Sequence, residues 1–288
     1  MKKWYLVGVI ALLVIGYGAG KYIMKVVQAP NEIEGYKVEE ASSGNHDQTI
    51  KVGQDQVHQG NLLLVNRKYP VHASGVVDDV VNLARSKELL QGYGLLNTKI
   101  QLSRGVAEKF IDMIGKAAKD GVNRFLISSG YRDEAEQTQL YKEMGADYAL
   151  PAGYSEHNLG LSLDIGSSQA EMNRAPEGKW LLEHAWTYGF ILRYPKDKTE
   201  ITGIQYEPWH FRYVGLPHSI IMKQENLTLE EYLDYLKEKK KLTITIGEKH
   251  YDVAYYPVSK KDTKIPVPSK GQYEVSGNNV DGVIVTAF

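Results

Sequence analysis

Two short motifs that lie far apart in the chain constrain its fold more strongly than any other feature. The segment SEHNLGLSLD occupies residues 155–164, and the segment EPWH occupies residues 207–210. Together they contain histidine and carboxylate side chains suited to a metal ion, and these can act together only where the two segments meet. The sequence therefore predicts a fold that brings a strand and a later short motif to one site.

The end of the first motif predicts a strand. Residues LSLDIG alternate in polarity, and successive side chains of a strand point to opposite faces. We expect Leu161, Leu163 and Ile165 to face the core. Ser162 and Asp164 then face a cleft on the other side of the strand.

The second motif predicts a bend in the chain. Glu207 and His210 are three residues apart, so a flat strand would direct them to opposite faces. A bend at Pro208 would bring them to one side, and proline is compatible with such a position. This arrangement differs from the helical H-E-x-x-H motif, in which both histidines lie on one helix face.

The residue types in these motifs point to a catalytic zinc site. The chain contains no cysteine, so imidazole and carboxylate groups must hold any metal ion. Three ligands, His157, Asp164 and His210, would leave the fourth tetrahedral position to water, as in catalytic rather than structural zinc sites. Glu207 would then be free to accept a proton from that water. Glu156 is a competing carboxylate, and strand alternation does not place it.

The evidence for this site comes from the combination of residues rather than from any one of them. A lone histidine is more often a surface residue or a satisfied core residue than a metal ligand. His157 considered alone would therefore be interpreted as structural.

A third motif, SSGYRDEAEQ at 128–137, follows a predicted buried strand, RFLISSG at 124–130. Arg132 lies at the predicted turn from this strand into a helix, where it could bind a carboxylate through two hydrogen bonds. A surface ion pair with Asp133 or Glu136 explains the arginine equally well.

Helical patterns alternate with short strands between residues 61 and 240, which indicates an α+β domain. We expect a small antiparallel sheet with flanking helices around a mononuclear zinc site. Further strands are predicted at NLLLVNRKYPV (61–71), FILRYP and GIQYEPWHFRYVG. Helices are predicted from Ser103 to near Gly121, over 133–144 and 176–188, and as a charged, exposed helix at LTLEEYLDYLKEKKK.

The last part of the chain changes character. Residues 241–288 contain the alternating segments KLTITI, HYDVAYYPV, QYEVS and GVIVTAF, with glycine and proline between them. This pattern predicts a small β-rich appendage. It contains no cluster of catalytic residue types.

The beginning of the chain predicts a membrane anchor over residues 1–27. Trp4 to Gly20 form an uncharged, mostly apolar run flanked by lysines, near the short end of the roughly 17–25 residues that span a bilayer. A cleaved secretion signal is the alternative. We favour the anchor because the apolar core is long and no clean A-x-A site follows it.

Residues 28–60 are polar and predict a flexible linker between the anchor and the folded part. The expected location is therefore the cell membrane, with a single N-terminal span and the catalytic domain on the extracytoplasmic side. The formal net charge of −1 gives no indication of a nucleic-acid partner.

Taken together, SGYR-x4-Q, S-x-H-x6-D and E-x-W-H resemble the M15 family of zinc peptidases that act on D-alanyl peptides. The resemblance runs from about Asn61 to Lys240, and the stretches ALPAGYSEHNLGLSLD and GFILRYPKDKTEITGIQYEPWHFRYVG carry most of it. It implies one Zn2+ ion per chain, held by His157, Asp164 and His210.

The resemblance also implies roles for the other motif residues. Glu207 is the implied general base. Arg132 is the implied catalytic arginine, which helps polarise the scissile carbonyl or holds the terminal carboxylate of the substrate. Gln137 and Ser155 match positions that line the substrate pocket.

The activity implied by the resemblance is that of a zinc-dependent D-alanyl-D-alanine carboxypeptidase. Such an enzyme removes the terminal D-Ala from peptidoglycan precursor pentapeptides and contributes to glycopeptide (vancomycin) resistance. A D,D-dipeptidase or an L,D-carboxypeptidase of the same fold is the enzymatic alternative. A non-catalytic cell-wall-binding module is a further alternative, against which the free carboxylate of Glu207 argues.

Overall fold

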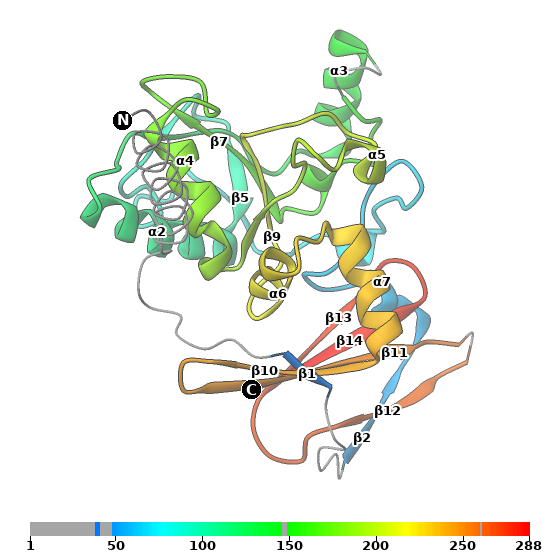
Figure 1. Ribbon diagram of the computed structural model, residues 1–288. Helices are drawn as coiled ribbons and strands as arrows, with labels where there is room; N and C mark the ends of the chain where they lie inside the picture. Colours follow the sequence, from blue (N-terminus) through cyan, green and yellow to red (C-terminus); the bar gives the residue numbers. More distant parts are fainter. Residues whose placement is uncertain (1–37, 41–47, 146–148, 260) are drawn as a thin grey trace, which may run out of the picture.

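A five-stranded sheet carries the motif residues and lies in the upper part of the molecule in Figure 1. The structure, a computed structural model, describes residues 38–40, 48–145, 149–259 and 261–288. The strand order is β4-β6-β7-β9-β8. The bounds are Gly94–Leu95 (β4), Phe125–Ser129 (β6), Ser162–Ser167 (β7), His210–Tyr213 (β9) and Phe190–Leu192 (β8). Strands β4 and β6 are parallel and the other neighbours are antiparallel, so the predicted small sheet is confirmed with one parallel pair added.

Three helices cover or flank this sheet as predicted. Helix α2 (Arg104–Lys119) begins at Ser103, whose Oγ accepts a hydrogen bond from the backbone N of Val106. Helix α3 (Glu134–Met144) begins with a capping box at Asp133 and ends at Gly145. Helix α4 (Pro176–His184) continues as the short 3-10 helix η4 (Ala185–Tyr188).

The largest hydrophobic core of the described residues lies between helices α2 and α4 and the sheet. The side chains of Phe110 and Met113 on α2 and of Leu163 and Ile165 on β7 are fully buried in it. This core fixes the face of β7 that carries apolar residues. The opposite face is consequently available for the polar residues of the motif.

Shorter elements complete this part of the chain. They are η1 (Gln54–His58), η2 (Ala73–Gly75), β3 (Val80–Asn82) paired with β5 (Gln101–Ser103), η3 (Glu156–Asn158), α5 (Thr199–Thr202) and α6 (His218–Gln224). The predicted strand at 61–71 is wrong, because that segment joins no sheet. Its apolar residues are nevertheless buried, among them Leu62 and Leu63, so their hydrophobicity reflects a buried loop rather than a strand.

Helix α7 (Leu229–Lys239) joins the two parts of the molecule (Figure 1). Its charged sequence predicts an exposed helix, but this prediction is wrong for one face. Leu229, Tyr232, Leu233 and Leu236 are buried, because this face packs against the C-terminal strands.

The predicted C-terminal strands are confirmed and form a second five-stranded sheet. Its order is β1-β10-β11-β14-β13, with bounds Val38–Glu40 (β1), Lys241–Ile246 (β10), Lys249–Pro257 (β11), Gly282–Ala287 (β14) and Tyr273–Gly277 (β13). Strand β12 (Thr263–Val267) leaves this sheet and pairs antiparallel with β2 (Gln48–Val52).

The second sheet shares a hydrophobic core with the first part of the chain. Ile191 and Val214 of the first part cluster with Leu233 of α7 and with Leu242 and Ile284 of the C-terminal strands. The boundary predicted near residue 241 therefore separates two sheets that share this core.

The flexible linker predicted over 28–60 is wrong for residues 48–58. Strand β2 pairs with β12 over its full length, and η1 follows it directly. Val52 and Val57 are buried with Ile265 and Val283. The segment is mostly polar, so its sequence does not indicate a core. Its few apolar residues, Val52 and Val57, are buried by strands that lie far away in the sequence.

The membrane anchor predicted over residues 1–27 lies outside the described residues. Within the ranges that the structure describes, no helix has the length and apolar character needed to cross a membrane.

Candidate active site

Two neighbouring strands position two of the predicted metal ligands. Asp164 on β7 and His210 at the start of β9 are direct partners in the antiparallel register. Ser162 and Asp164 share a face of β7, while Leu163 and Ile165 are fully buried on the other. The alternation predicted from the sequence is confirmed, but the cleft predicted beside Ser162 is wrong, because Ser162 is fully buried and donates to Glu156 Oε2.

The bend predicted at Pro208 is also confirmed. The backbone N of His210 donates a hydrogen bond to the carbonyl oxygen of Glu207 at 3.2 Å, which closes a turn over Pro208 and Trp209. The turn brings Glu207 Oε2 to 3.7 Å from His210 Nδ1. Residues three apart therefore meet at one side of the sheet.

The third predicted ligand, His157, comes from the short helix η3 and is oriented by the carbonyl group that follows β6. His157 Nδ1 lies 2.6 Å from the carbonyl oxygen of Gly130, which leaves Nε2 directed toward Asp164. A Cβ at position 130 would collide with the carbonyl oxygen of Gln101. Only glycine therefore permits the backbone path that presents this carbonyl to His157.

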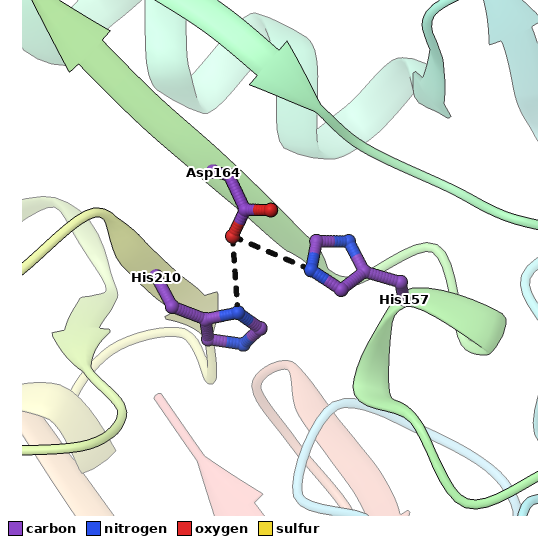
Figure 2. A group of neighbouring side chains, drawn as sticks. All are labelled: His157, Asp164 and His210. Carbon is purple, nitrogen blue, oxygen red and sulfur yellow. Dashed lines mark hydrogen bonds and ion pairs between the residues drawn. The ribbon is translucent and has the colours of Figure 1, made fainter. Parts of the chain in front are cut away.

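The three predicted ligands converge on a common point. His157 Nε2 lies 3.4 Å and His210 Nδ1 lies 3.1 Å from the same carboxylate oxygen, Asp164 Oδ1. Figure 2 shows the carboxylate between the two rings, which are nearly perpendicular, with an angle of 86° between their planes. These residues form a group that could hold a metal ion, with one candidate donor atom from each.

The chemistry of this donor set fits zinc. Two imidazoles and one carboxylate form one of the three-ligand sets that catalytic zinc sites use, with a remaining position for water. His157 and His210 are both buried, and Asp164 is mostly buried. The site is therefore shielded from bulk water except on the side of Asp164 and Glu207.

The charges around the cluster shift the pKa values of its members in different directions. Burial and the nearby Arg132 lower the pKa of His157. Burial alone would lower the pKa of His210, but hydrogen bonds to Asp164 and Glu156 raise it to about 9. Burial would raise the pKa of Asp164, but the two histidines hold it well below its usual range.

Glu207 has a pKa raised above its ordinary value, chiefly by burial. Asp164 and Glu156 add to this rise, and His210 and Arg132 oppose it. A raised pKa makes the carboxylate a stronger base, which suits a group that must accept a proton near neutral pH.

We expect zinc binding to release about one proton per chain at pH 7. His210 with a pKa of about 9 is protonated in the metal-free protein, whereas His157 is neutral because its pKa is lowered. Zinc must displace the proton on His210. The apparent affinity should therefore fall by about tenfold for each pH unit below about 9, and lose this dependence above it. Calorimetric titration in buffers of different ionisation enthalpy measures the proton count, and a count of zero would contradict the assignment of His210.

Arg132 lies beside the metal cluster and not on an open surface. Its Nε donates to Gln137 Oε1 at 2.8 Å and its Nη1 donates to Ser129 Oγ at 2.6 Å. Its charge interacts with Asp164 and Glu207 and, to a smaller extent, with Glu136. The alternative of a surface pair with Asp133 or Glu136 is not observed, because no salt bridge joins Arg132 to either carboxylate.

Gln137 supports Arg132. It is buried, its Oε1 accepts the Arg132 bond, and its Nε2 donates to the carbonyl oxygen of Leu150. Both ends of the amide are thus occupied by the protein. Contact with substrate would have to come through the arginine that Gln137 holds.

Ser155 caps η3 at the start of the first motif. Its Oγ accepts a hydrogen bond from the backbone N of His157 at 3.4 Å. The hydroxyl hydrogen is not used in this bond. Ser155 is buried and holds the turn that presents His157.

Sequence reasoning left Glu156 unplaced. The structure buries it completely behind His210, where its Oε2 lies 3.3 Å from His210 Nε2. Burial would raise the pKa of Glu156, but Arg212 and Arg193 lower it well below its usual range. Strand alternation could not find this residue because it lies in a 3-10 turn, and its arginine partners come from later segments.

An α+β fold that brings three candidate metal ligands together beside a further carboxylate is the arrangement expected of a metal-dependent hydrolase. Residues 99–216 match the VanY family, described as D-alanyl-D-alanine carboxypeptidase. A D-alanyl-D-alanine carboxypeptidase of Enterococcus faecium is 54% identical over 294 residues, which cover 100% of this chain and 97% of the relative. The chain belongs to the VanY family of D-alanyl-D-alanine carboxypeptidases.

Two solved structures extend the comparison. The vancomycin-resistance D,D-dipeptidase VanXYg, in complex with a D-Ala-D-Ala phosphinate analogue, is 34% identical with a TM-score of 0.73. The match covers 83% of this chain and 98% of VanXYg. A mutant of a VanY D,D-pentapeptidase from a VanB-type resistance cassette, in complex with Zn(II), is 31% identical with a TM-score of 0.50, covering 60% of this chain and 98% of that one.

Proposed function

We propose that this chain is a zinc-dependent D-alanyl-D-alanine carboxypeptidase that removes the terminal D-Ala from peptidoglycan precursor pentapeptides. One observation carries the proposal. Glu207 lies 3.7 Å from a candidate metal ligand, outside the three-ligand set, and has a raised pKa. A purely structural zinc site has no need of such a base.

One Zn2+ ion per chain would be held by His157, Asp164 and His210. When bound, zinc would acidify a water molecule and polarise the scissile carbonyl. The Zn(II) complex of a VanY relative supports this choice of metal. The donor set of two imidazoles and a carboxylate supports it independently.

Glu207 accepts the proton of the attacking water, whose oxygen forms a bond to the carbonyl carbon before the terminal D-Ala. When the C–N bond breaks, Glu207 returns this proton to the leaving amine. Arg132, held by Gln137 and Ser129, binds the terminal carboxylate of the peptide or stabilises the negative charge that develops on the carbonyl oxygen. Ser155 contributes its hydroxyl donor to the pocket.

A D,D-dipeptidase is the second candidate activity, and the VanXYg relative favours it. An L,D-carboxypeptidase is the other alternative within the fold. Loss of the terminal D-Ala would leave a tetrapeptide, which lacks the D-Ala-D-Ala end that glycopeptides recognise. In this way the activity would contribute to vancomycin resistance.

For the location we propose the extracytoplasmic side of the cell membrane, with residues 1–27 as the anchor. The support is the apolar run from Trp4 to Gly20. Precursor peptides would then reach the site outside the cytoplasm.

The decisive experiment supplies three substrates to the purified protein: a pentapeptide ending in D-Ala-D-Ala, the free D-Ala-D-Ala dipeptide, and a tetrapeptide with an L,D terminal bond. We expect release of D-Ala from the pentapeptide, its loss after a chelator removes the metal, and its return on addition of Zn2+. Mass spectrometry identifies the products. Faster cleavage of the dipeptide or of the tetrapeptide would replace the proposal by the corresponding alternative.

A further inference from the structure

A buried network of charged residues lies directly behind the candidate metal site. Glu156 Oε1 accepts hydrogen bonds from Arg193 Nε and Arg212 Nη1, each at 2.8 Å. Both guanidinium groups and the carboxylate are fully buried, with side chains 0% exposed. Arg193 also makes two bonds to Glu230 on helix α7, at 2.8 and 2.7 Å.

The two arginines fix the orientation of the Glu156 carboxylate. Because both bond to Oε1, the other oxygen, Oε2, points toward the metal site. Oε2 accepts a hydrogen bond from Ser162 Oγ at 3.2 Å and lies 3.3 Å from His210 Nε2. Arg212 is itself anchored by the carbonyl oxygens of Asn61 and Leu63, so the carboxylate has little freedom to turn.

His210 thus meets carboxylates at both ring nitrogens. Nδ1 faces Asp164 and Glu207, where a metal would bind, and Nε2 faces Glu156. A histidine can give the lone pair of one nitrogen to a metal only when its proton is on the other nitrogen. A carboxylate that accepts this proton fixes both the tautomer and the plane of the ring.

We propose that Glu156 is a positioning residue for the metal site, holding His210 with its proton on Nε2 so that Nδ1 is presented to zinc. The inference rests on the metal-dependent hydrolysis proposed above. Glu156 acts through His210 and does not itself touch the reacting atoms. Arg193 and Arg212 serve to hold it in the required orientation.

Replacement of Glu156 by glutamine tests this inference sharply. If the glutamine carbonyl oxygen faces the two arginines, its NH2 group faces His210 Nε2, and two donors confront each other. If the amide is turned round, the NH2 group faces the two guanidinium groups. The first arrangement is the less costly, because it opposes the NH2 group to one ring N–H and not to two cations. We therefore expect Glu156→Gln to weaken zinc binding by about 10- to 100-fold, the range typical for partners of metal-binding histidines.

A matched control is available in the same network. Glu230→Gln removes charge from the other carboxylate that binds Arg193, but Glu230 makes no contact with His210. We expect this variant to lower the Tm and to keep the zinc Kd within about twofold of the wild-type value. Competition with a chromophoric chelator gives the Kd of each protein, and circular dichroism gives the Tm.

The outcomes separate positioning from general stability. Weaker zinc binding in Glu156→Gln but not in Glu230→Gln supports the inference. Equal zinc affinity in all three proteins overturns it, as does an equal loss in both variants. Because affinity is measured without turnover, wild-type protein that binds zinc but releases no D-Ala would reject the proposed function and leave this inference standing.

A second measurement does not depend on the folding of a variant. In the zinc-loaded wild-type protein, nitrogen-15 NMR of the imidazole groups should show His210 Nε2 as a protonated, hydrogen-bonded nitrogen with slow solvent exchange. A freely exchanging Nε2 proton, or a proton on Nδ1, would overturn the inference.

Discussion

Replacing Glu207 by glutamine is expected to lower kcat by about 10²- to 10⁴-fold, the usual contribution of a general acid–base group, and to leave the zinc content unchanged. Glutamine keeps the size of the side chain but cannot accept the proton of the attacking water. The carboxylate lies outside the set of His157, Asp164 and His210, so zinc should remain bound. Steady-state assays with the pentapeptide and metal analysis of the same samples measure both quantities.

Glu200→Gln provides the matched control for this prediction. Glu200 is an exposed residue of helix α5, and the same chemical change there should leave kcat within about twofold, since exposed sites away from special features are tolerant. If Glu207→Gln retained a tenth or more of the wild-type kcat, Glu207 would have to be removed from the role of general base. Loss of zinc from this variant would instead place it among the ligands.

The second large effect is expected from His157→Ala, which should lose both zinc and activity. Loss of partners around a metal ligand typically costs 10- to 100-fold in affinity, so loss of a ligand itself should weaken zinc binding by more than about 100-fold. His157 Nδ1 also lies within hydrogen-bond distance of the carbonyl oxygen of Gly130. Alanine cannot make that hydrogen bond. Metal analysis after dialysis, together with the chelator competition assay, gives the affinity.

His250→Ala is the control for loss of a histidine outside the site. His250 is exposed on β11, and its Nδ1 lies 2.8 Å from Thr245 Oγ1. We expect this variant to bind zinc and to turn over the pentapeptide like the wild-type protein. A His157→Ala protein with unchanged zinc content would refute the ligand assignment, whatever its activity.

The two variants should differ in their combined effects on zinc binding and on kcat. Glu207→Gln separates metal binding from chemistry, while His157→Ala removes both together. This contrast follows from the geometry, in which three candidate donors converge on one point and the carboxylate of Glu207 lies outside that group, with its Oε2 3.7 Å from His210 Nδ1. If Glu207 were a ligand together with His157, Asp164 and His210, both variants would be expected to lose zinc affinity.

The C-terminal strands are more closely tied to the catalytic part than an appendage would be. They share a hydrophobic core with Ile191, Val214 and helix α7. The network behind the metal site also reaches α7, because Arg193 bonds to Glu230 in its first turn. Removal of residues 241–288 would therefore expose part of this shared core.

Local rules account for what the sequence determined by itself. The polarity pattern of LSLDIG fixed which side of β7 carries Asp164, since successive side chains of a strand point to opposite faces. Pro208 indicated the turn that brings Glu207 and His210 together, and Ser103 and Asp133 marked the starts of helices by their capping side chains. The candidate ligands and the candidate base could be selected from the sequence because the combination of their residue types and spacing suits this chemistry.

Only the tertiary structure decided which distant groups share a buried environment. The buried carboxylate of Glu156 is paired with Arg193 and Arg212, which come from later segments. The local sequence of the 3-10 turn at 156–158 does not predict these ion pairs. Gln137 became a support for Arg132 because its amide oxygen accepts the arginine bond while its Nε2 donates to the carbonyl oxygen of Leu150, beyond the end of its helix. Likewise, residues 48–58 look polar and open until β12 and β13 bury their few valines. Burial and charge pairing depend on neighbours in space, whereas turns, caps and strand faces depend on neighbours in sequence.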